Sequence, residues 1–177
     1  MGETKSTKER FMRQAIALAE EAAKKGNAPF GAVIVNTSTG EIACQGSNHA
    51  DQNSIWHGEM DAINNLSYVA DKKGISVYEY CKRNNLVLYT TAEPCAMCMG
   101  CVLFTGISNV VYGTSIDKLK EFGWNQIAIS CVELARMSWM EVKVEAGLLE
   151  ELTNQLYAKG PFVEAPTSND DTMILKK

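Results

Sequence analysis

Two short motifs, far apart in the chain, constrain the fold more than any other feature of the sequence. The first is His57-x-Glu59, and the second is Pro94-Cys95-x-x-Cys98. An imidazole and two thiols form a ligand set found in catalytic zinc sites, and the carboxylate need not bind the metal. We therefore expect a fold that brings the start of one segment against the start of the other.

The composition is that of a single globular domain. The chain has 177 residues, of which 46% are hydrophobic and 21% are charged, which is enough to bury a core. We expect one domain over residues 1–177, with its core at about 6–157 and a C-terminal tail at 160–177. The net charge of −4 argues against broad electrostatic binding to nucleic acid. No stretch approaches the roughly 20 apolar residues that span a bilayer.

The cysteine pattern favours metal binding over disulfide bonds. The chain has 6 cysteines, and Cys95, Cys98 and Cys101 follow one another at helical spacing. No apolar signal segment lies ahead of the first expected helix, so we expect a reduced, cytoplasmic protein. Cys101 lies a further turn from the start of its segment, and we expect it to pack in the core.

Apolar periodicity predicts an α/β domain in which helices and strands alternate. A capping box beginning at Ser6 opens the first helix, and Pro94 opens the helix of the second motif. Expected helices cover residues 6–26, 59–66, 96–104, 131–137 and 148–157, with a short helix in the charged stretch at about 70–85. Expected strands cover 30–35, 42–45, 86–90, 110–112 and 140–144. The first two strands form a hairpin, and the later alternation implies parallel pairing across the two motif helices. Residues 113–130 are expected to form a loop.

The order H-x-E…P-C-x-x-C is that of zinc deaminases of nucleobases. A zinc ion lowers the pKa of a bound water from 15.7 to about 7, and three protein ligands leave a position for that water. His57, Cys95 and Cys98 are the predicted ligands of one zinc per chain. Glu59 lies two residues from His57, and residues two apart on a helix do not share a face, so we assign it the proton shuttle. A structural zinc knuckle and a redox Cys-x-x-Cys are the alternatives.

On these motifs, and on residues 29–33 (PFGAV) and 46–48 (GSN), the chain resembles the cytidine deaminase-like superfamily. It is most similar to the branch that contains bacterial guanine deaminases and tRNA adenosine deaminases. The resemblance extends from the first helix to about Leu156. It implies a three-layer α/β/α fold with a five-stranded mixed sheet, and it implies a homodimer.

The resemblance also implies base-binding positions. Asn48 corresponds to an asparagine that contacts the substrate base or sugar, and Phe30 and Phe104 correspond to walls of the ring pocket. The backbone at Gly58 and Ala92 would lie beside the substrate amine. Packing or turn geometry is the alternative role for each of these residues.

The sequence departs from the family pattern in several places. Bacterial guanine deaminases carry a second acidic residue where this chain has GWNQ at residues 123–126, and Asp117 or Glu121 is the nearest replacement. Trp56 stands before the motif histidine, where it would stack on substrate, cover the site or pack. His49 lacks motif context, so we expect a solvated loop histidine.

These observations predict a zinc-dependent hydrolytic deaminase of a small-molecule base or nucleoside, with guanine or another purine as the first candidate. A tRNA adenosine deaminase and a deaminase of cytosine-type or other small heterocycles are alternatives. From Glu141 to the C-terminus, 7 acids face 4 lysines, which disfavours RNA. A non-catalytic zinc protein is the remaining alternative, and Glu59 argues against it because a structural site needs no second carboxylate.

Overall fold

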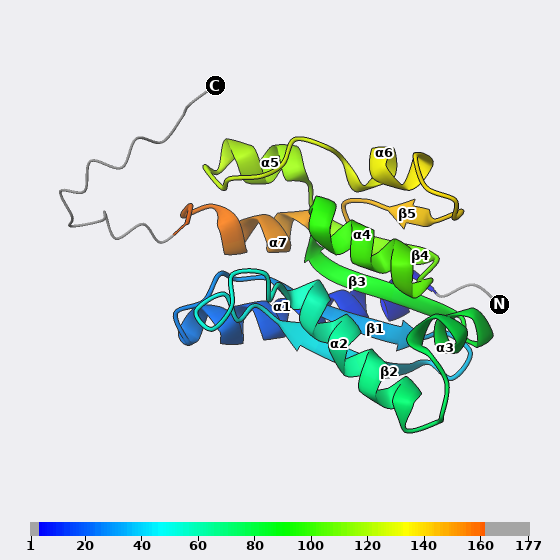
Figure 1. Cartoon of the computed structure of the whole chain (residues 1–177). Helices are drawn as coiled ribbons and strands as arrows, with labels where there is room; N and C mark the ends of the chain where they lie inside the picture. The colour runs from blue at the N-terminus through cyan, green and yellow to red at the C-terminus, as the bar shows by residue number, and fades with distance from the viewer. Residues whose placement is uncertain (1–3, 162–177) are drawn as a thin grey trace, which may run out of the picture.

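The computed structural model describes residues 4–161, in which helices and strands alternate along the chain (Figure 1). The predicted C-terminal tail lies outside the described residues from residue 162 onward. The elements are α1 (Lys5–Lys24), β1 (Gly31–Asn36), β2 (Glu41–Ser47), α2 (Gly58–Asp71), α3 (Val77–Arg83), β3 (Leu86–Ala92), α4 (Ala96–Thr105), β4 (Asn109–Thr114), α5 (Ile116–Glu121), α6 (Cys131–Arg136), β5 (Lys143–Glu145) and α7 (Glu150–Tyr157).

The strands form a five-stranded mixed sheet in the order β2-β1-β3-β4-β5. β1 pairs antiparallel with both β2 and β3, whereas β3, β4 and β5 run parallel to one another. Every residue of the central strand β3 is buried, as expected for a strand covered on both faces. The hairpin and the parallel β3–β4 pair were both predicted. The parallel pairing predicted across the first motif helix is wrong, because β2 and β3 run in the same direction but β1 lies between them and pairs with both.

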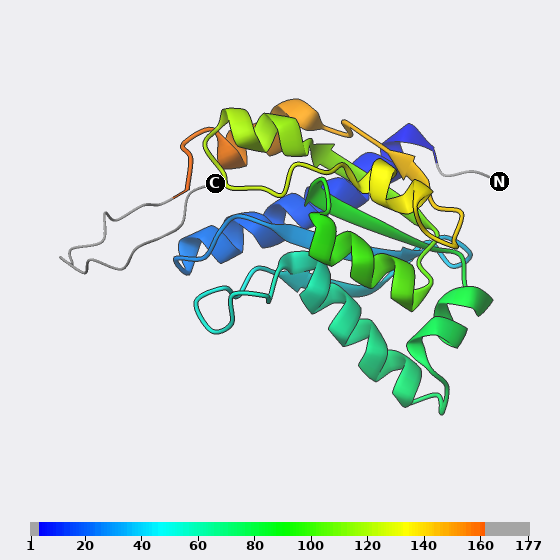
Figure 2. The same cartoon turned by 45° about the horizontal axis from the view of Figure 1, so that its top comes forward.

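Helices cover both faces of the sheet, so the predicted three-layer α/β/α architecture is confirmed (Figures 1 and 2). On one face, α1 and the residues just before α7 pack against alternate side chains of β1, β3 and β4. On the other face, α2, α3, α4 and α6 enclose a larger apolar cluster. No helix within residues 4–161 is long and apolar enough to cross a membrane.

Two helix starts differ from the prediction. The N-cap of α1 is Thr4, whose side chain accepts the N–H of Thr7, so the capping box expected at Ser6 is wrong. The N-cap of α4 is Cys95, and Pro94 therefore precedes the helix instead of opening its first turn. Both shifts are small, and the second puts a motif thiol at the end of the helix where backbone N–H groups are free.

The loop predicted after Gly113 contains a helix. Ser115 caps α5 by accepting the N–H of Lys118, and Ile116 and Leu119 are its buried residues. A six-residue helix holds fewer than two turns, which is too short for apolar periodicity to identify it.

Candidate functional site

The two motifs meet at one end of the sheet. β2 and β3 both run antiparallel to β1, so their carboxyl ends lie at the same end of the sheet. The helix that follows each strand begins at that end of the sheet, with His57 as the N-cap of α2 and Cys95 as the N-cap of α4. Gly46 lets α2 pack directly on β2, since a Cβ there would lie 2.2 Å from the backbone nitrogen of Ala62. Two helix N-termini, which stabilise negative charge, therefore converge on one place.

His57, Cys95 and Cys98 form a cluster with the geometry of a metal site. Their ligand atoms all lie within 4.8 Å of one another. The Nδ1 atom of His57 is 3.7 Å from Sγ of Cys95 and 3.6 Å from Sγ of Cys98. Nitrogen and sulfur ligands of a tetrahedral zinc, at about 2.0–2.1 Å and about 2.3 Å from the metal, lie about 3.6 Å apart. The three side chains therefore fit a zinc ion and leave its fourth position open.

Hydrogen bonds and burial shift the pKa of each of these groups. The Cys98 thiol, together with the His57 imidazole, lowers the pKa of Cys95 to about 4 although the group is partly buried. The hydrogen bond with Cys95, followed by burial, raises the pKa of Cys98 well above its ordinary value. The hydrogen bond to Cys95 also raises the pKa of His57. One sulfur is thus a thiolate at neutral pH, and the other must lose a proton before both bind a cation.

Glu59 lies beside this cluster without belonging to it. Its side chain is buried, and burial raises the pKa of its carboxyl group. The Oε1 atom accepts a hydrogen bond from the Thr90 hydroxyl at 3.1 Å, and Oε2 lies 3.5 Å from Sγ of Cys98. A buried carboxyl next to metal ligands, with one oxygen fixed and the other facing the cluster, is arranged to exchange protons there.

A hollow of about 190 Å³ opens onto these groups. It is lined by Ala28, Phe30, Asn48, Ala50, His57, Glu59, Glu93, Cys95, Leu119, Trp124, Asn125 and Gln126. No lysine or arginine is among them. The sequence predicted five of these residues as site residues, namely Phe30, Asn48, His57, Glu59 and Cys95. Trp124, Asn125 and Gln126 were not predicted as site residues, because periodicity indicated only a loop there and the resemblance pointed to this segment only as the place of a missing acid.

Asn48 and Phe30 line the hollow as predicted. Asn48 is 3% exposed, and its Oδ1 atom accepts the N–H of Ala50 at 3.0 Å. Within the described part of the chain, no group accepts a hydrogen bond from its Nδ2 atom. Phe30 packs against Tyr157 and meets the edge of Trp124, with ring centroids 5.0 and 5.4 Å apart. The hollow therefore combines an aromatic wall with an amide donor that is free for a ligand.

The other predicted base-binding residues do not line the hollow. Gly58 and Ala92 are buried beside the hollow but do not line it, and a Cβ at Gly58 would lie 3.0 Å from the carbonyl oxygen of Phe30. Phe104 is 73% exposed and packs on Trp139 at a centroid distance of 5.2 Å, away from the hollow. Its position as a pocket wall is therefore wrong within this chain, because it occupies the opposite end of α4 from Cys95.

The two acids considered as a second proton shuttle are also outside the hollow. The side chain of Asp117 is 91% exposed, and that of Glu121 is 64% exposed in an ion pair with Lys118. The resemblance pointed to the correct segment, since residues 124–126 line the hollow, but it did not show that the side chains of these two acids face solvent. Cys101 packs against the core cluster, as predicted.

His49 and Trp56 belong to a polar network at the base of the loop that carries Asn48. Asp61 accepts hydrogen bonds from the Ser47 backbone and from Nε1 of Trp56, both at 3.0 Å. Nε2 of His49 lies 3.5 Å from the same carboxylate, and its ring lies against Trp56. The prediction of a solvated histidine is therefore wrong, and Trp56 packs instead of facing the hollow.

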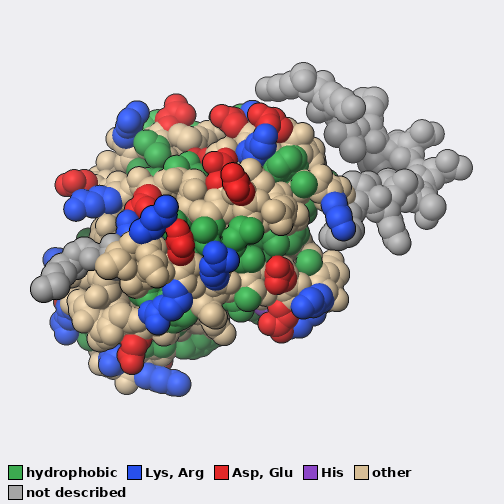
Figure 3. Space-filling view, turned by 180° about the vertical axis from the view of Figure 1, so that it is seen from behind, with side chains coloured by type: hydrophobic (Ala, Val, Ile, Leu, Met, Phe, Trp, Pro, Cys, Tyr) green, Lys and Arg blue, Asp and Glu red, His purple; other side chains and the backbone are tan. Residues whose placement is uncertain are grey.

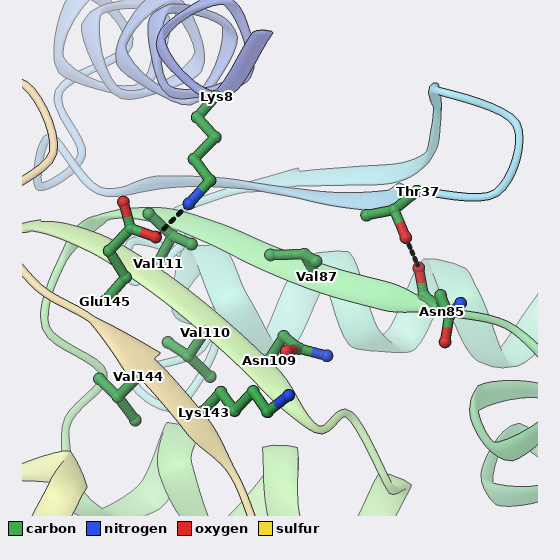
Figure 4. A pocket seen from close by; sticks show the side chains of 10 residues that line it. All are labelled: Lys8, Thr37, Asn85, Val87, Asn109, Val110, Val111, Lys143, Val144 and Glu145. Atoms are coloured by element: carbon green, nitrogen blue, oxygen red, sulfur yellow. Dashed lines mark hydrogen bonds and ion pairs between the residues drawn. The ribbon is translucent and has the colours of Figure 1, made fainter. Parts of the chain in front are cut away.

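A second hollow, of about 470 Å³, lies at the other end of the sheet (Figure 4). Lys8 and Glu145 form an ion pair across it, and the Thr37 hydroxyl donates to the carbonyl oxygen of Asn85. It holds no cluster of metal-ligating or nucleophilic side chains. The face opposite to the view of Figure 1 carries acidic and basic side chains interspersed, without a continuous basic area (Figure 3).

An open three-ligand metal cluster beside a buried carboxyl group, at the carboxyl ends of α/β strands, defines a zinc-type hydrolase site. Residues 5–114, more than half of the chain, match the family model of the cytidine and deoxycytidylate deaminase zinc-binding region. The chain therefore belongs to this family and is a zinc-type deaminase of nucleosides or nucleobases.

The relatives and structural neighbours span several substrates. The chain is 33% identical to the tRNA-specific adenosine deaminase of Rickettsia bellii over 109 residues. This aligned region covers 60% of this chain and 70% of that protein. It is 31% identical over 109 residues to a probable cytosine deaminase of Schizosaccharomyces pombe, covering 62% of this chain and 61% of that protein. The solved structure of guanine deaminase from Nitrosomonas europaea has the same fold, with a TM-score of 0.69, 23% identity, and coverage of 84% and 81%.

Proposed function

We propose that this protein is a hydrolytic deaminase that uses one zinc ion per chain to replace the exocyclic amine of a purine base or nucleoside with oxygen. The observation that carries this proposal is the buried Glu59 carboxyl beside the open cluster of His57, Cys95 and Cys98. Zinc held by these ligands would lower the pKa of water from 15.7 to about 7 and so provide a nucleophile near neutral pH.

Glu59 does the proton work in this proposal. Its Oε2 atom, which is turned toward Cys98, takes a proton from the attacking water. The same oxygen delivers this proton to the ring nitrogen while the remaining hydroxide adds to the ring carbon. It then takes the second proton, from the hydroxyl group now on that carbon, and delivers it to the departing amine, so the products are ammonia and a ring carbonyl. The Thr90 hydroxyl holds Oε1 and keeps the carboxyl group in one rotamer throughout. The raised pKa of Glu59 brings the group closer to the neutral range in which a shuttle must both accept and release protons.

The hollow supports a small uncharged heterocycle as substrate. Its volume of about 190 Å³ lies below the 300–1,000 Å³ typical of pockets for drug-sized ligands. Nδ2 of Asn48 would donate to a carbonyl or ring nitrogen of the base, and Phe30 would pack on the ring. Because no lysine or arginine lines the hollow, it offers no partner for a phosphate group.

An ammonia-release screen tests the proposal. The zinc-loaded protein would be incubated with guanine, adenine, cytosine, their nucleosides and the corresponding monophosphates. We expect turnover of a purine base or nucleoside and at least about tenfold lower kcat/KM for its monophosphate. Release of ammonia from none of these compounds would refute the proposal, and cytosine as the best substrate would replace the purine assignment.

A tRNA adenosine deaminase is the second candidate, and the 33% identity to the Rickettsia bellii protein favours it. Against it stands the absence of lysine and arginine from the lining of the hollow, since proteins that follow a nucleic-acid backbone use cationic grooves. A gel shift with tRNA at rising salt, combined with inosine analysis of the product, distinguishes the two. Inosine formation with salt-sensitive binding would favour the tRNA function.

We also propose that a second copy of this chain covers the free side of α4. The helix sequence AMCMGCVLFT has no charged residue, and helices that are apolar all round are normally buried. The exposed Phe104 packs on Trp139, which is itself 65% exposed, and Met137, two residues before Trp139, is 68% exposed. Sedimentation velocity should give a dimer for the wild type and a monomer for Phe104→Glu. A monomeric wild type at micromolar concentration would contradict this.

A further inference from the structure

Glu93 connects three parts of the molecule through one buried carboxylate. It follows β3 and comes two residues before the predicted zinc ligand Cys95, and its side chain is 5% exposed. Oε2 accepts the backbone N–H of Ile116 at 2.9 Å, and Oε1 accepts the backbone N–H of Cys131 at 2.8 Å. Its own N–H donates to the carbonyl oxygen of Thr114 at 2.7 Å. Within residues 4–161, no lysine, arginine or histidine forms an ion pair with it.

The two N–H groups belong to the first residues of α5 and α6. N–H groups in the first turn of a helix have no partner inside the helix, and the helix dipole favours a negative charge there. The Glu93 carboxylate thus accepts one otherwise unpaired backbone N–H at the start of each of the two helices. Figure 1 shows these two helices along the same side of the molecule, connected by residues 122–130.

The connecting segment forms one wall of the hollow. Trp124, Asn125 and Gln126 line the hollow from this segment. The segment is held near its start by Nε1 of Trp124, which donates to the carbonyl oxygen of Tyr157 at 3.0 Å. The far end of the segment is held by the backbone N–H of Cys131, which donates a hydrogen bond to Oε1 of Glu93. The position of this wall therefore depends on the carboxylate that stands next to the metal-binding segment.

We propose that Glu93 is a positioning residue that fixes residues 122–130 as the substrate-contacting wall and so sets substrate affinity. Glu93 lines the hollow, but both of its oxygens accept backbone N–H groups of α5 and α6, so we assign it to positioning and not to proton transfer. The inference rests on the proposed function only for its kinetic readout, since the position of the wall is measurable without turnover.

The first experiment compares Glu93→Gln with the wild type. Glutamine has the same shape but keeps only one acceptor oxygen, so one helix start loses its partner and faces an amide donor. We expect a rise in KM of about tenfold or more for the best substrate of the ammonia screen, with kcat changed less than about threefold. Zinc content should stay at one per chain. Hydrogen exchange should accelerate in residues 122–130 but not in the loop that carries Asn48. Glu133→Gln, on the exposed side of α6, is the matched control and should change none of these values.

A second variant removes the same contact from the other side. Proline is accommodated at the first position of a helix, and the extended Ser130 (φ −72°, ψ 150°) suits a following proline. Cys131→Pro therefore deletes the donor N–H together with the buried thiol, and Cys131→Ala, which deletes the thiol alone, is its control. We expect the same rise in KM and the same hydrogen-exchange change as for Glu93→Gln. The double variant should be no worse than the more severe single variant, because both remove one interaction. If Glu93→Gln does not fold, Cys131→Pro carries the test alone.

The outcomes separate this inference from the proposed function. If the wild type releases no ammonia from any compound, the proposed function fails, and faster exchange in residues 122–130 still supports the positioning role. A loss of kcat of about a hundredfold in Glu93→Gln with unchanged KM and unchanged exchange would overturn it, since this is the signature of a group acting in chemistry. Unchanged KM and exchange in both variants would also overturn it.

Discussion

Replacing Glu59 by glutamine should separate activity from stability. The variant keeps the shape and can still accept from the Thr90 hydroxyl, but it cannot carry a proton between water, ring and amine. Positioned acid–base groups contribute about 10² to 10⁴-fold, and Glu59 serves several transfers, so we expect the upper end of that range. A 10⁴-fold loss of kcat corresponds to about 5.5 kcal/mol. KM and zinc content should change little, because Glu59 is not a ligand in the cluster.

The same substitution should stabilise the zinc-free protein. Glu59 is 4% exposed, and no lysine or arginine of the described chain forms an ion pair with it, so its ionised form is disfavoured on folding. Burial raises the pKa of this acid, so the wild type loses stability as the pH rises through that folded pKa. We expect Glu59→Gln to gain about 1 kcal/mol at neutral pH, or roughly 2–4 °C in Tm, and to lose that advantage in acid where the carboxyl is protonated.

Ammonia release, metal analysis and thermal unfolding at several pH values measure these effects. Glu121→Gln is the control, since Glu121 is 64% exposed on α5 and should affect neither activity nor stability. If Glu59→Gln keeps more than a tenth of wild-type kcat, the shuttle assignment is refuted. If Glu121→Gln is inactive instead, Glu121 takes part in proton transfer, and the exposed position that the structure gives its side chain is contradicted.

The remaining predictions concern the metal and the packing beneath it. Cys98→Ala should lose stoichiometric zinc while Cys101→Ala, one turn along the same helix, keeps it; metal analysis showing zinc in both would remove Cys98 from the ligand set. Zinc binding at pH 7 should release at least about one proton, because the pKa of Cys98 is raised while Cys95 is already ionised, so zinc affinity should fall as pH falls. Calorimetry in buffers of different ionisation enthalpy measures this release, and proton uptake would contradict the assignment. Gly46→Ala should cost about 3 kcal/mol in urea unfolding, since its Cβ meets α2 backbone, and a cost under about 0.5 kcal/mol would mean that α2 can shift freely.

The sequence predicted the parts of the site that depend on local signals. His57 and Cys95 were expected at helix starts, and both are N-caps. The strand before Cys95 was predicted at residues 86–90 from its apolar run, and β3 covers this range. These features depend on turn-forming residues and on periodicity over a few residues, so they can be predicted from one sequence alone.

The missed parts depend on tertiary contacts. The wall around Trp124 follows a helix of six residues, and its position depends on Glu93, which is distant in sequence. The resemblance placed Phe104 in the pocket, and the sequence of α4 does not contradict this because the helix has no charged residue to mark its outer face. His49 appeared solvated because nothing local indicates that Asp61 of the next helix lies against it.

The central claim is that His57, Cys95 and Cys98 hold one zinc ion on which deamination depends. Elemental analysis of the purified protein, coupled to activity during chelation and zinc return, tests it most directly. We predict one zinc per chain, loss of ammonia release when the metal is removed, and recovery when zinc is restored. Full activity in protein freed of metal, or a chain that takes up no stoichiometric zinc, would contradict the account.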